Sequence, residues 1–351
     1  MPLRRRLATV TAATALLAAL ALPGASVAKA PAGFFGVVPQ GPVTEADLER
    51  MAGTVETLRV PVEWSQVEAR RGVDDLGALD QLVGAAAERG IRVLPVVSGT
   101  PAWLRPAPAM PPLGATGLRA YAGFLRTLVR RYGAGGDFWE GRAARLPIRD
   151  WQVWNEPNFP AFWRPEPSPR GYAKLLRAAA GAIRGADRNA RVVLAGVAPI
   201  TNSMKPWVFI RRLYRVPGVE RWFDVAAVHP YSVSMRGTVA QIILARRAMA
   251  AAGDARTPLL VGELAVASRG TEPTSFVRSA AAPAAYLAEA FGLLTRERRR
   301  WRLAGIHWYG WQDSSLADAF CAFCEGSGLM RLDGTPKPAW AAYRAAVARA
   351  R

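Results

Sequence analysis

The fold is decided by the stretch Asp150-Trp151-Gln152-Val153-Trp154-Asn155-Glu156-Pro157-Asn158. Its first half is rich in apolar residues and predicts a buried strand, and its second half sets an amide and a carboxylic acid where that strand ends. Burial among apolar neighbours raises the pKa of a carboxyl, which is what a proton donor at neutral pH requires. The alternative interpretation is that Glu156 caps the next helix and that Asn-Glu-Pro is turn chemistry.

A second strand of the same kind is Pro258-Leu259-Leu260-Val261-Gly262-Glu263, in which apolar residues again run to a glutamate. Two glutamates at the C-terminal ends of buried strands are what glycoside hydrolysis needs. One carboxylic acid protonates the leaving oxygen, and the other carboxylate attacks the anomeric carbon or activates water. The sequence therefore predicts Glu156 and Glu263 as a catalytic pair.

Strand-like and helix-like segments alternate along the rest of the chain, which predicts a parallel sheet covered by helices. Eight such units in about 320 residues match a (β/α)8 TIM barrel, which carries its active site at the C-terminal ends of the strands. A doubly wound open sheet is the alternative, but no glycine-rich phosphate loop follows the first strand. The predicted strands span residues 33–38, 57–62, 91–97, 150–154, 191–195, 223–228, 258–263 and 304–311, and the predicted helices span residues 44–53, 76–89, 118–132, 168–184, 205–214, 238–252, 280–296 and 337–349.

The first 28 residues read as a secretory signal peptide, with three arginines at 4–6, an apolar run over 7–22 and small residues up to Ala28. A retained membrane anchor is the alternative, but the apolar run is short for a span of about 20 residues. We therefore expect cleavage after Ala28, a single catalytic domain over residues 29–351 and secretion without stable membrane insertion, with association to the cell wall as a further option.

The formal charge is +19, and removing the three arginines of residues 1–28 leaves +16. Such a charge is compatible with an anionic glycan or with nucleic acid. Four lysines stand against forty-two arginines, which indicates a bias towards GC-rich codons instead. Because no basic stripe is interleaved with aromatic residues, we do not expect nucleic-acid binding.

The two cysteines, Cys321 and Cys324, favour a local structural disulfide in an exported protein. A zinc site would need two more ligands, and the two histidines, His229 and His307, lie in strand-like segments. The sequence therefore predicts neither a metal nor an organic cofactor.

Taken together, these motifs resemble the clan A glycoside hydrolases, and most of all families 5 and 39, over essentially the whole mature chain. The resemblance implies a (β/α)8 barrel whose acid/base glutamate follows the fourth strand and whose nucleophile lies on the seventh. Carried over by position, Glu156 is the acid/base, Glu263 is the nucleophile, and Asn155 binds the sugar 2-hydroxyl.

The resemblance also assigns roles to three residues on other strands. His229-Pro230-Tyr231 is similar to the His-x-Tyr of family 5, in which the tyrosine contacts the nucleophile and the histidine lines the pocket. Arg59 resembles the arginine that keeps the nucleophile ionised. The alternatives are a satisfied core histidine at 229 and an arginine on the outer face of the barrel at 59.

Aromatic residues supply the expected sugar contacts, because sugar C–H faces pack on aromatic planes. The resemblance places Trp311 beneath the reacting sugar. Trp308 is the alternative for this position, because the strand register decides which of the two rings points inward. Trp163 is a predicted further platform, and ordinary loop packing is its alternative. Trp64 and Trp103 have the same two interpretations, and Trp340 is expected to be structural.

The mechanism that the resemblance implies is double displacement with retention of configuration, for which the carboxyl groups stand about 5–5.5 Å apart. We expect a raised pKa for Glu156 and a low one for Glu263. The substrate is an oligo- or polysaccharide whose sugar and linkage the fold does not specify. Three alternatives stay open: a non-catalytic carbohydrate-binding barrel, a transglycosylase that uses the same residues, and a basic structural protein of the cell wall.

Overall fold

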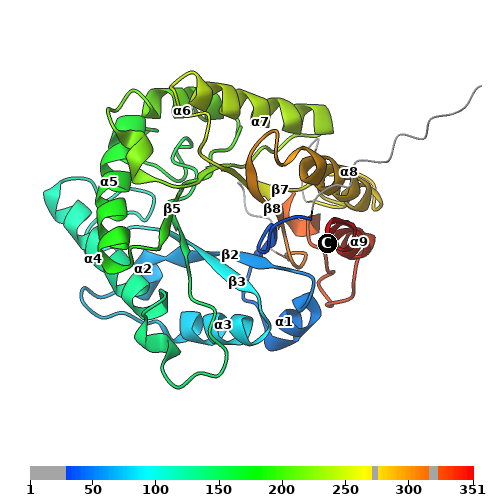
Figure 1. Cartoon of the computed structure of the whole chain (residues 1–351), viewed down its shortest axis with the longest axis horizontal. Helices are drawn as coiled ribbons and strands as arrows, with labels where there is room; N and C mark the ends of the chain where they lie inside the picture. The colour runs from blue at the N-terminus through cyan, green and yellow to red at the C-terminus, as the bar shows by residue number, and fades with distance from the viewer. Residues whose placement is uncertain (1–28, 271–275, 316–322) are drawn as a thin grey trace, which may run out of the picture.

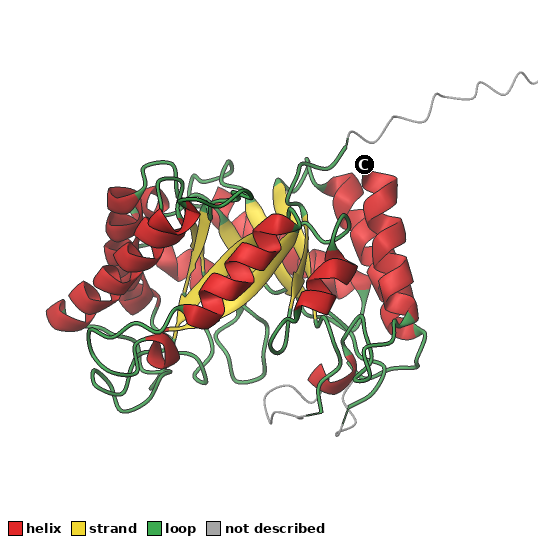
Figure 2. Cartoon of the chain, turned by 90° about the horizontal axis from the view of Figure 1, so that it is seen from below, coloured by secondary structure: helices red, strands yellow, loops and turns green. Residues whose placement is uncertain are grey.

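The computed structural model describes residues 29–270, 276–315 and 323–351. Within these residues, eight parallel strands follow the order β5-β4-β3-β2-β1-β8-β7-β6. The bridges Val193–Val225 and Val197–Val228 join the two edges of this sheet, so it closes into a barrel with the helices outside (Figures 1 and 2). The predicted (β/α)8 barrel is confirmed.

The strands and helices follow one another in the predicted order. The strands are β1 Phe35–Val38, β2 Thr57–Glu63, β3 Arg92–Ser98, β4 Asp150–Val153, β5 Arg191–Leu194, β6 Ala226–Val228, β7 Leu259–Leu264 and β8 Leu303–Tyr309. The α-helices are α1 Glu45–Met51, α2 Trp64–Val67, α3 Gly77–Glu88, α4 Ala115–Tyr132, α5 Pro169–Ala186, α6 Pro206–Leu213, α7 Met235–Ala250, α8 Ala282–Glu297 and α9 Pro338–Ala350, and short 3-10 helices span η1 Asp137–Trp139, η2 Val219–Trp222 and η3 Cys324–Gly326.

The helix starts are fixed by local capping. Thr44 and Asp47 form a capping box at the start of α1, and the Ser168 hydroxyl accepts from the Gly171 amide at the start of α5. Helix α7 begins at Met235, three residues before the predicted start, because Ser234 supplies its cap.

The barrel interior is apolar towards the starts of the strands and polar towards their ends. A compact buried cluster lies in the first part and consists of Leu94, Val193, Val225, Ala227 and Leu260. The much larger core lies between the sheet and the helices. Polar residues of the barrel therefore gather at the C-terminal ends of the strands, where the long loops lie.

Two predictions fall outside the described residues. The signal peptide over residues 1–28 is one, and Cys321, which the disulfide prediction requires, is the other. Among the described helices, none is long and apolar enough to cross a bilayer.

Candidate active site

Glu156 follows β4 on a sharply turned stretch of backbone. Trp154 has a φ of 70° and Glu156 a φ of 39°, and both values are unusual for residues other than glycine. The turn is fixed because the Trp154 amide donates to the Val97 carbonyl and the Glu156 amide donates to the Gly196 carbonyl, at 3.0 and 3.1 Å. Such strain tends to occur at functional sites, and here it directs a carboxyl that is only 5% exposed.

Asn158 holds the loop that carries Glu156. Its Nδ2 atom donates to the carbonyls of Ala198 and Met204 at 2.7 and 2.8 Å, and its Oδ1 atom accepts from the Ala198 amide at 3.2 Å. The fully buried side chain thereby joins the loops after β4 and β5. This positioning role was not predicted, although Asn158 stands in the motif that opens the sequence analysis.

Glu263 lies on β7, where the pairing with β8 shifts register between Val261 and Leu264. Its side chain meets two hydrogen-bond donors. The Nη1 atom of Arg59 donates to Oε1 at 2.5 Å, and the Tyr231 hydroxyl donates to Oε2 at 2.8 Å. Both bonds stabilise the ionised carboxylate of a residue that is 7% exposed.

Arg59 is 3% exposed and contacts Glu263 on β7 inside the barrel, so the alternative of an outward-facing arginine is wrong. Its Nε atom donates to Gln152 Oε1 at 2.7 Å, and its Nη2 atom donates to Asn155 Oδ1 at 2.9 Å. The guanidinium therefore orients one residue of β4 and one residue of the following turn, besides Glu263. Asn155 has its amide oxygen fixed in this way, which leaves its Nδ2 atom as the donor that it can offer to a substrate.

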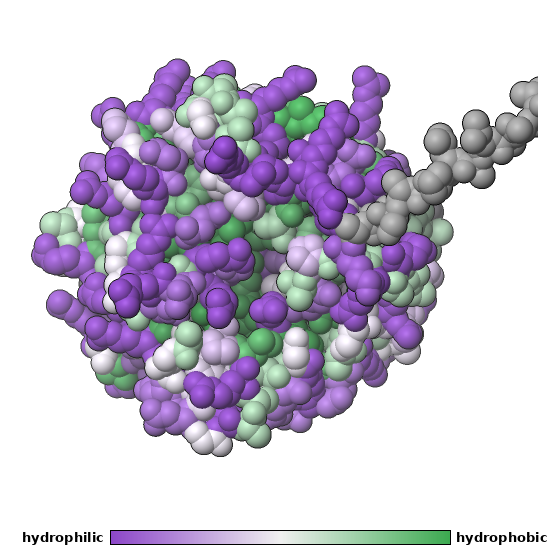
Figure 3. Space-filling view, in the orientation of Figure 1, coloured by the Kyte–Doolittle hydropathy of each residue, from purple (hydrophilic) through white to green (hydrophobic). Residues whose placement is uncertain are grey.

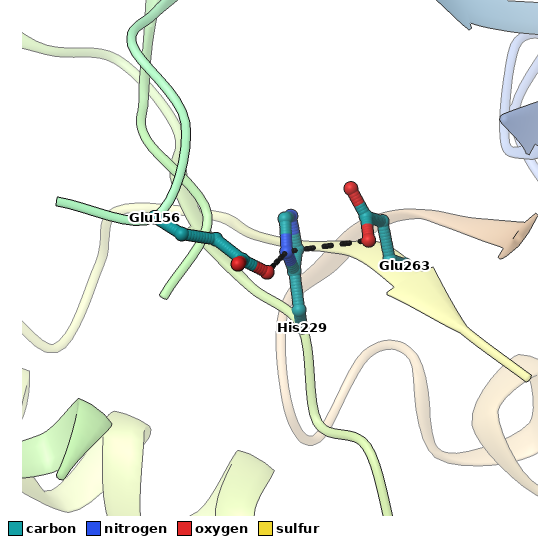
Figure 4. A group of neighbouring side chains, drawn as sticks. All are labelled: Glu156, His229 and Glu263. Atoms are coloured by element: carbon teal, nitrogen blue, oxygen red, sulfur yellow. Dashed lines mark hydrogen bonds and ion pairs between the residues drawn. The ribbon is translucent and has the colours of Figure 1, made fainter. Parts of the chain in front are cut away.

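His229 lies between the two glutamates, as Figure 4 shows. Its Nδ1 atom is 2.7 Å from Glu156 Oε1 and 3.6 Å from Glu263 Oε2. The ring fits because position 196 is a glycine, where a Cβ atom would lie 1.9 Å from Nε2. Burial and the positive charge of Arg59 lower the pKa of His229 well below its usual range, so the imidazole is neutral.

The two carboxyl groups differ in their surroundings. Burial, together with the negative charge of Glu263, raises the pKa of Glu156 well above its usual range, and the charge of Arg59 only partly opposes this. The raised pKa favours the protonated form of Glu156, which a general acid needs. Glu263 instead accepts hydrogen bonds from Arg59 and Tyr231. A pair of carboxyls with different environments is typical of acid and nucleophile assignments.

Glu156, His229 and Glu263 could also be considered as metal ligands, because one ligand atom from each lies within 4.8 Å of the others. The Arg59 guanidinium already pairs with Glu263 and places a positive charge beside the cluster. The donor set therefore suits a proton donor paired with a nucleophilic carboxylate better than it suits a divalent cation.

The structure corrects the predicted place of Trp311. The ring is 2% exposed, its Nε1 atom donates to Asp47 Oδ1 at 2.8 Å, and it packs edge-on against Trp340. The backbone leaves β8 at Gly310, whose φ of 105° turns the chain towards α1 and α9. The aromatic residue of β8 that does reach the site is Tyr309, whose ring centroid lies 6.3 Å from that of Tyr231.

The prediction that Trp163 is a sugar platform is also corrected, because its buried ring packs against Trp154 and Tyr172 and is not available to a sugar. Trp308 donates from Nε1 to the Ser327 carbonyl on the outside of the barrel. Around Tyr231, the partly buried rings form an aromatic cluster that consists of Tyr309, Phe276 and Phe323. Of the other predicted platforms, Trp64 is buried and Trp103 is half-buried and donates to the Glu68 carbonyl.

Comparisons with known proteins agree on the class of fold. No protein-family model matches the sequence, and no curated protein matches it. Among solved structures, a family 39 glycoside hydrolase from the gut symbiont Bacteroides cellulosilyticus WH2 is 21% identical, with a TM-score of 0.66 over 90% of this chain and 63% of that chain. This chain thus spans less than two thirds of that protein's length.

Two other solved structures share the fold over more of their length. A family 39 β-xylosidase from Caulobacter crescentus is 22% identical, with a TM-score of 0.65 over 90% of this chain and 72% of that chain. A GH5_18 protein from Streptomyces cattleya, in complex with GlcNAc, is 21% identical, with a TM-score of 0.67 over 92% and 81%. The structures that share this fold thus include members of families 39 and 5, the two families that the sequence motifs resemble.

Proposed function

We propose that this protein is a glycoside hydrolase that cleaves β-linked oligo- or polysaccharides with retention of configuration. The observation that carries the proposal is the approach of Glu156 and Glu263, which have carboxyl oxygens within 4.8 Å of one another. Retaining enzymes hold their carboxyl groups about 5–5.5 Å apart, whereas inverting enzymes leave about 6.5–9.5 Å for a water molecule. The spacing here supports the retaining mechanism.

In the first step, a carboxylate oxygen of Glu263 attacks the anomeric carbon and forms an ester bond to it. The bond from that carbon to the leaving oxygen breaks, and Glu156 transfers its proton to this oxygen. Arg59 and Tyr231 keep the nucleophile oriented through their bonds to its two oxygens. Positioning of this kind accounts for much of the rate of a displacement reaction.

In the second step, Glu156 removes a proton from water, which attacks the anomeric carbon and releases Glu263 as a carboxylate. Esterification removes the negative charge of Glu263, which is one cause of the raised pKa of Glu156. The pKa of Glu156 therefore falls in the intermediate, and the same residue becomes a competent base. His229, neutral and 2.7 Å from Glu156 Oε1, gives this carboxyl a partner in both protonation states.

The proposal includes export of the enzyme, which rests on the charged, apolar and small-residue segments of residues 1–28. A carbohydrate is the proposed partner, since the site holds what glycoside chemistry needs. The family 39 and GH5_18 structures that share the fold support the class of reaction without specifying the sugar.

The test is mass spectrometry of the mature protein after incubation with a panel of 2-fluoro β-glycosides with good leaving groups. We expect one covalent glycosyl adduct on a peptide that contains Glu263, and no adduct in Glu263→Gln. The exposed Glu140 supplies the matched control, so Glu140→Gln should label as the wild type does. An adduct elsewhere, or an α-configured first product by NMR from a β-glycoside that is turned over, would contradict the proposal.

A further inference from the structure

A second cavity lies at the opposite end of the barrel, where the strands begin. It has a volume of about 330 Å³ and is bounded by the starts of β3, β4 and β5. Ligand cavities in proteins measure about 300–1,000 Å³. Figure 3 shows this face of the molecule, with hydrophilic residues around a hollow near its centre in which apolar residues are visible.

The rim of this cavity is positively charged. Arg92, Arg149 and Arg191 line it together with one carboxylate, Asp150, so the lining carries a net charge of +2. Arg191 is neutralised, because its Nε and Nη2 atoms each lie 2.6 Å from an oxygen of Asp150. Neither Arg92 nor Arg149 forms an ion pair with a described residue, so two guanidinium groups remain available to an anion.

His307 lies at the inner end of the same cavity. It is 1% exposed, and its Nδ1 atom has no hydrogen-bond partner among the described residues. An unpaired buried polar atom costs about 1–3 kcal/mol, and a hydrogen-bonding ligand in the cavity would remove this cost. Burial and the charge of Arg59 lower the pKa of His307 to about 3, which leaves the ring neutral.

Between the rim and His307 the cavity wall is apolar. Leu94, Val193, Val225 and Leu260 line it and are themselves almost completely buried. A bare inorganic ion would satisfy the arginines but would make no contact with this wall. A ligand with an apolar body and an anionic head uses both parts of the cavity.

We propose that the N-terminal mouth of the barrel binds a small organic oxyanion. Its phosphate, sulfate or carboxylate head lies between Arg92 and Arg149, because a guanidinium matches the geometry of an oxyanion with two parallel hydrogen bonds. Its body lies along the apolar wall and reaches His307. This site is separate from the glutamates and does not depend on the proposed function.

The test is a thermal-shift titration with phenyl phosphate at constant ionic strength, with inorganic phosphate and phenol as the two comparison ligands. We expect a saturable rise in Tm with phenyl phosphate, since a ligand that binds the folded state stabilises it. Binding should weaken at least about tenfold in Arg92→Gln/Arg149→Gln, which corresponds to 1.4 kcal/mol or more. The matched control is Arg126→Gln/Arg130→Gln, which removes two exposed arginines of α4 and should bind as the wild type does.

Imidazole NMR gives an independent measurement, because the chain contains two histidines. Phenyl phosphate should shift the His307 signals in the wild type and in the α4 control, but not in Arg92→Gln/Arg149→Gln. An equal response in both double variants would show a non-specific effect of arginine charge and would overturn the proposal. If inorganic phosphate bound as tightly as phenyl phosphate, the apolar body would contribute nothing to binding, and the proposal of an organic ligand would be overturned.

Discussion

The contact between Arg59 and Glu263 predicts a strong energetic coupling. Replacing Arg59 by methionine keeps an unbranched side chain in the barrel but removes the guanidinium. Glu263 is then a buried carboxylate that keeps Tyr231 as a donor and loses its neighbouring positive charge. Gln152 and Asn155 each lose a donor as well.

The expected loss follows from these contacts. Removing one partner of a buried ion pair costs about 3–5 kcal/mol, and each acceptor left without a donor adds about 1–3 kcal/mol when it is buried. At about 2 °C per kcal/mol, Arg59→Met should lower the Tm by at least about 6–10 °C. Adding Glu263→Gln removes the uncompensated charge, so the double variant should lose about 2–3 kcal/mol less than the sum of the single losses.

The assay is urea unfolding of the wild type, Arg59→Met, Glu263→Gln and the double variant. Arg191→Met is the matched control, since Arg191 pairs with Asp150 in a partly exposed position. Exposed pairs contribute about 0.2–1 kcal/mol, and the control should lose no more than that. An Arg59→Met protein as stable as the wild type, or single losses that simply add in the double variant, would refute the reasoning.

Three further predictions concern other residues. Because the pKa of Glu156 is raised in the folded state, its contribution to stability is present below the usual carboxyl range and is lost as pH rises through the raised value. Glu156→Gln should remove this loss of stability with rising pH, as unfolding measured at a series of pH values would show. An unchanged pH profile of stability would contradict the raised pKa. Asn158→Ala should lower the free energy of unfolding by about 1–3 kcal/mol and kcat about tenfold or more, because the loops after β4 and β5 lose the side chain that joins them. Unfolding and steady-state kinetics would measure the two effects, and an unchanged kcat would contradict the positioning role. Trp311→Phe should lower the free energy of unfolding by about 1 kcal/mol and leave kcat/KM unchanged, whereas Tyr309→Ala should lower kcat/KM by an order of magnitude or more. A larger fall in kcat/KM for Trp311→Phe than for Tyr309→Ala would restore Trp311 as the sugar platform.

The barrel could be predicted because each of its units carries a local signal. The strand before Glu156 and the strand up to Glu263 are apolar runs that end on a carboxyl, and Ser168 and Thr44 mark helix starts through capping. The parallel topology then places both carboxyls at the same end of the barrel. Their meeting could therefore be predicted without any knowledge of side-chain contacts.

The aromatic contacts could not be predicted with the same success. Their directions depend on which strand residues face inward and on the point where the chain leaves the strand. Trp311 follows Gly310, whose backbone turn changes the direction of the next side chain. The roles of Gln152 and Asn158 depend on partners that are distant in sequence, such as Arg59 and the loop after β5, and no local pattern indicates them.

The close approach between His229 and Gly196 restricts the mutational paths that are open to this protein. Any larger residue at position 196 would displace the imidazole, and a smaller residue at position 229 alone would deprive Glu156 of its nearest polar partner. The two positions are therefore expected to be epistatic. In a saturation library, functional variants with a side chain at 196 should appear together with a replacement at 229.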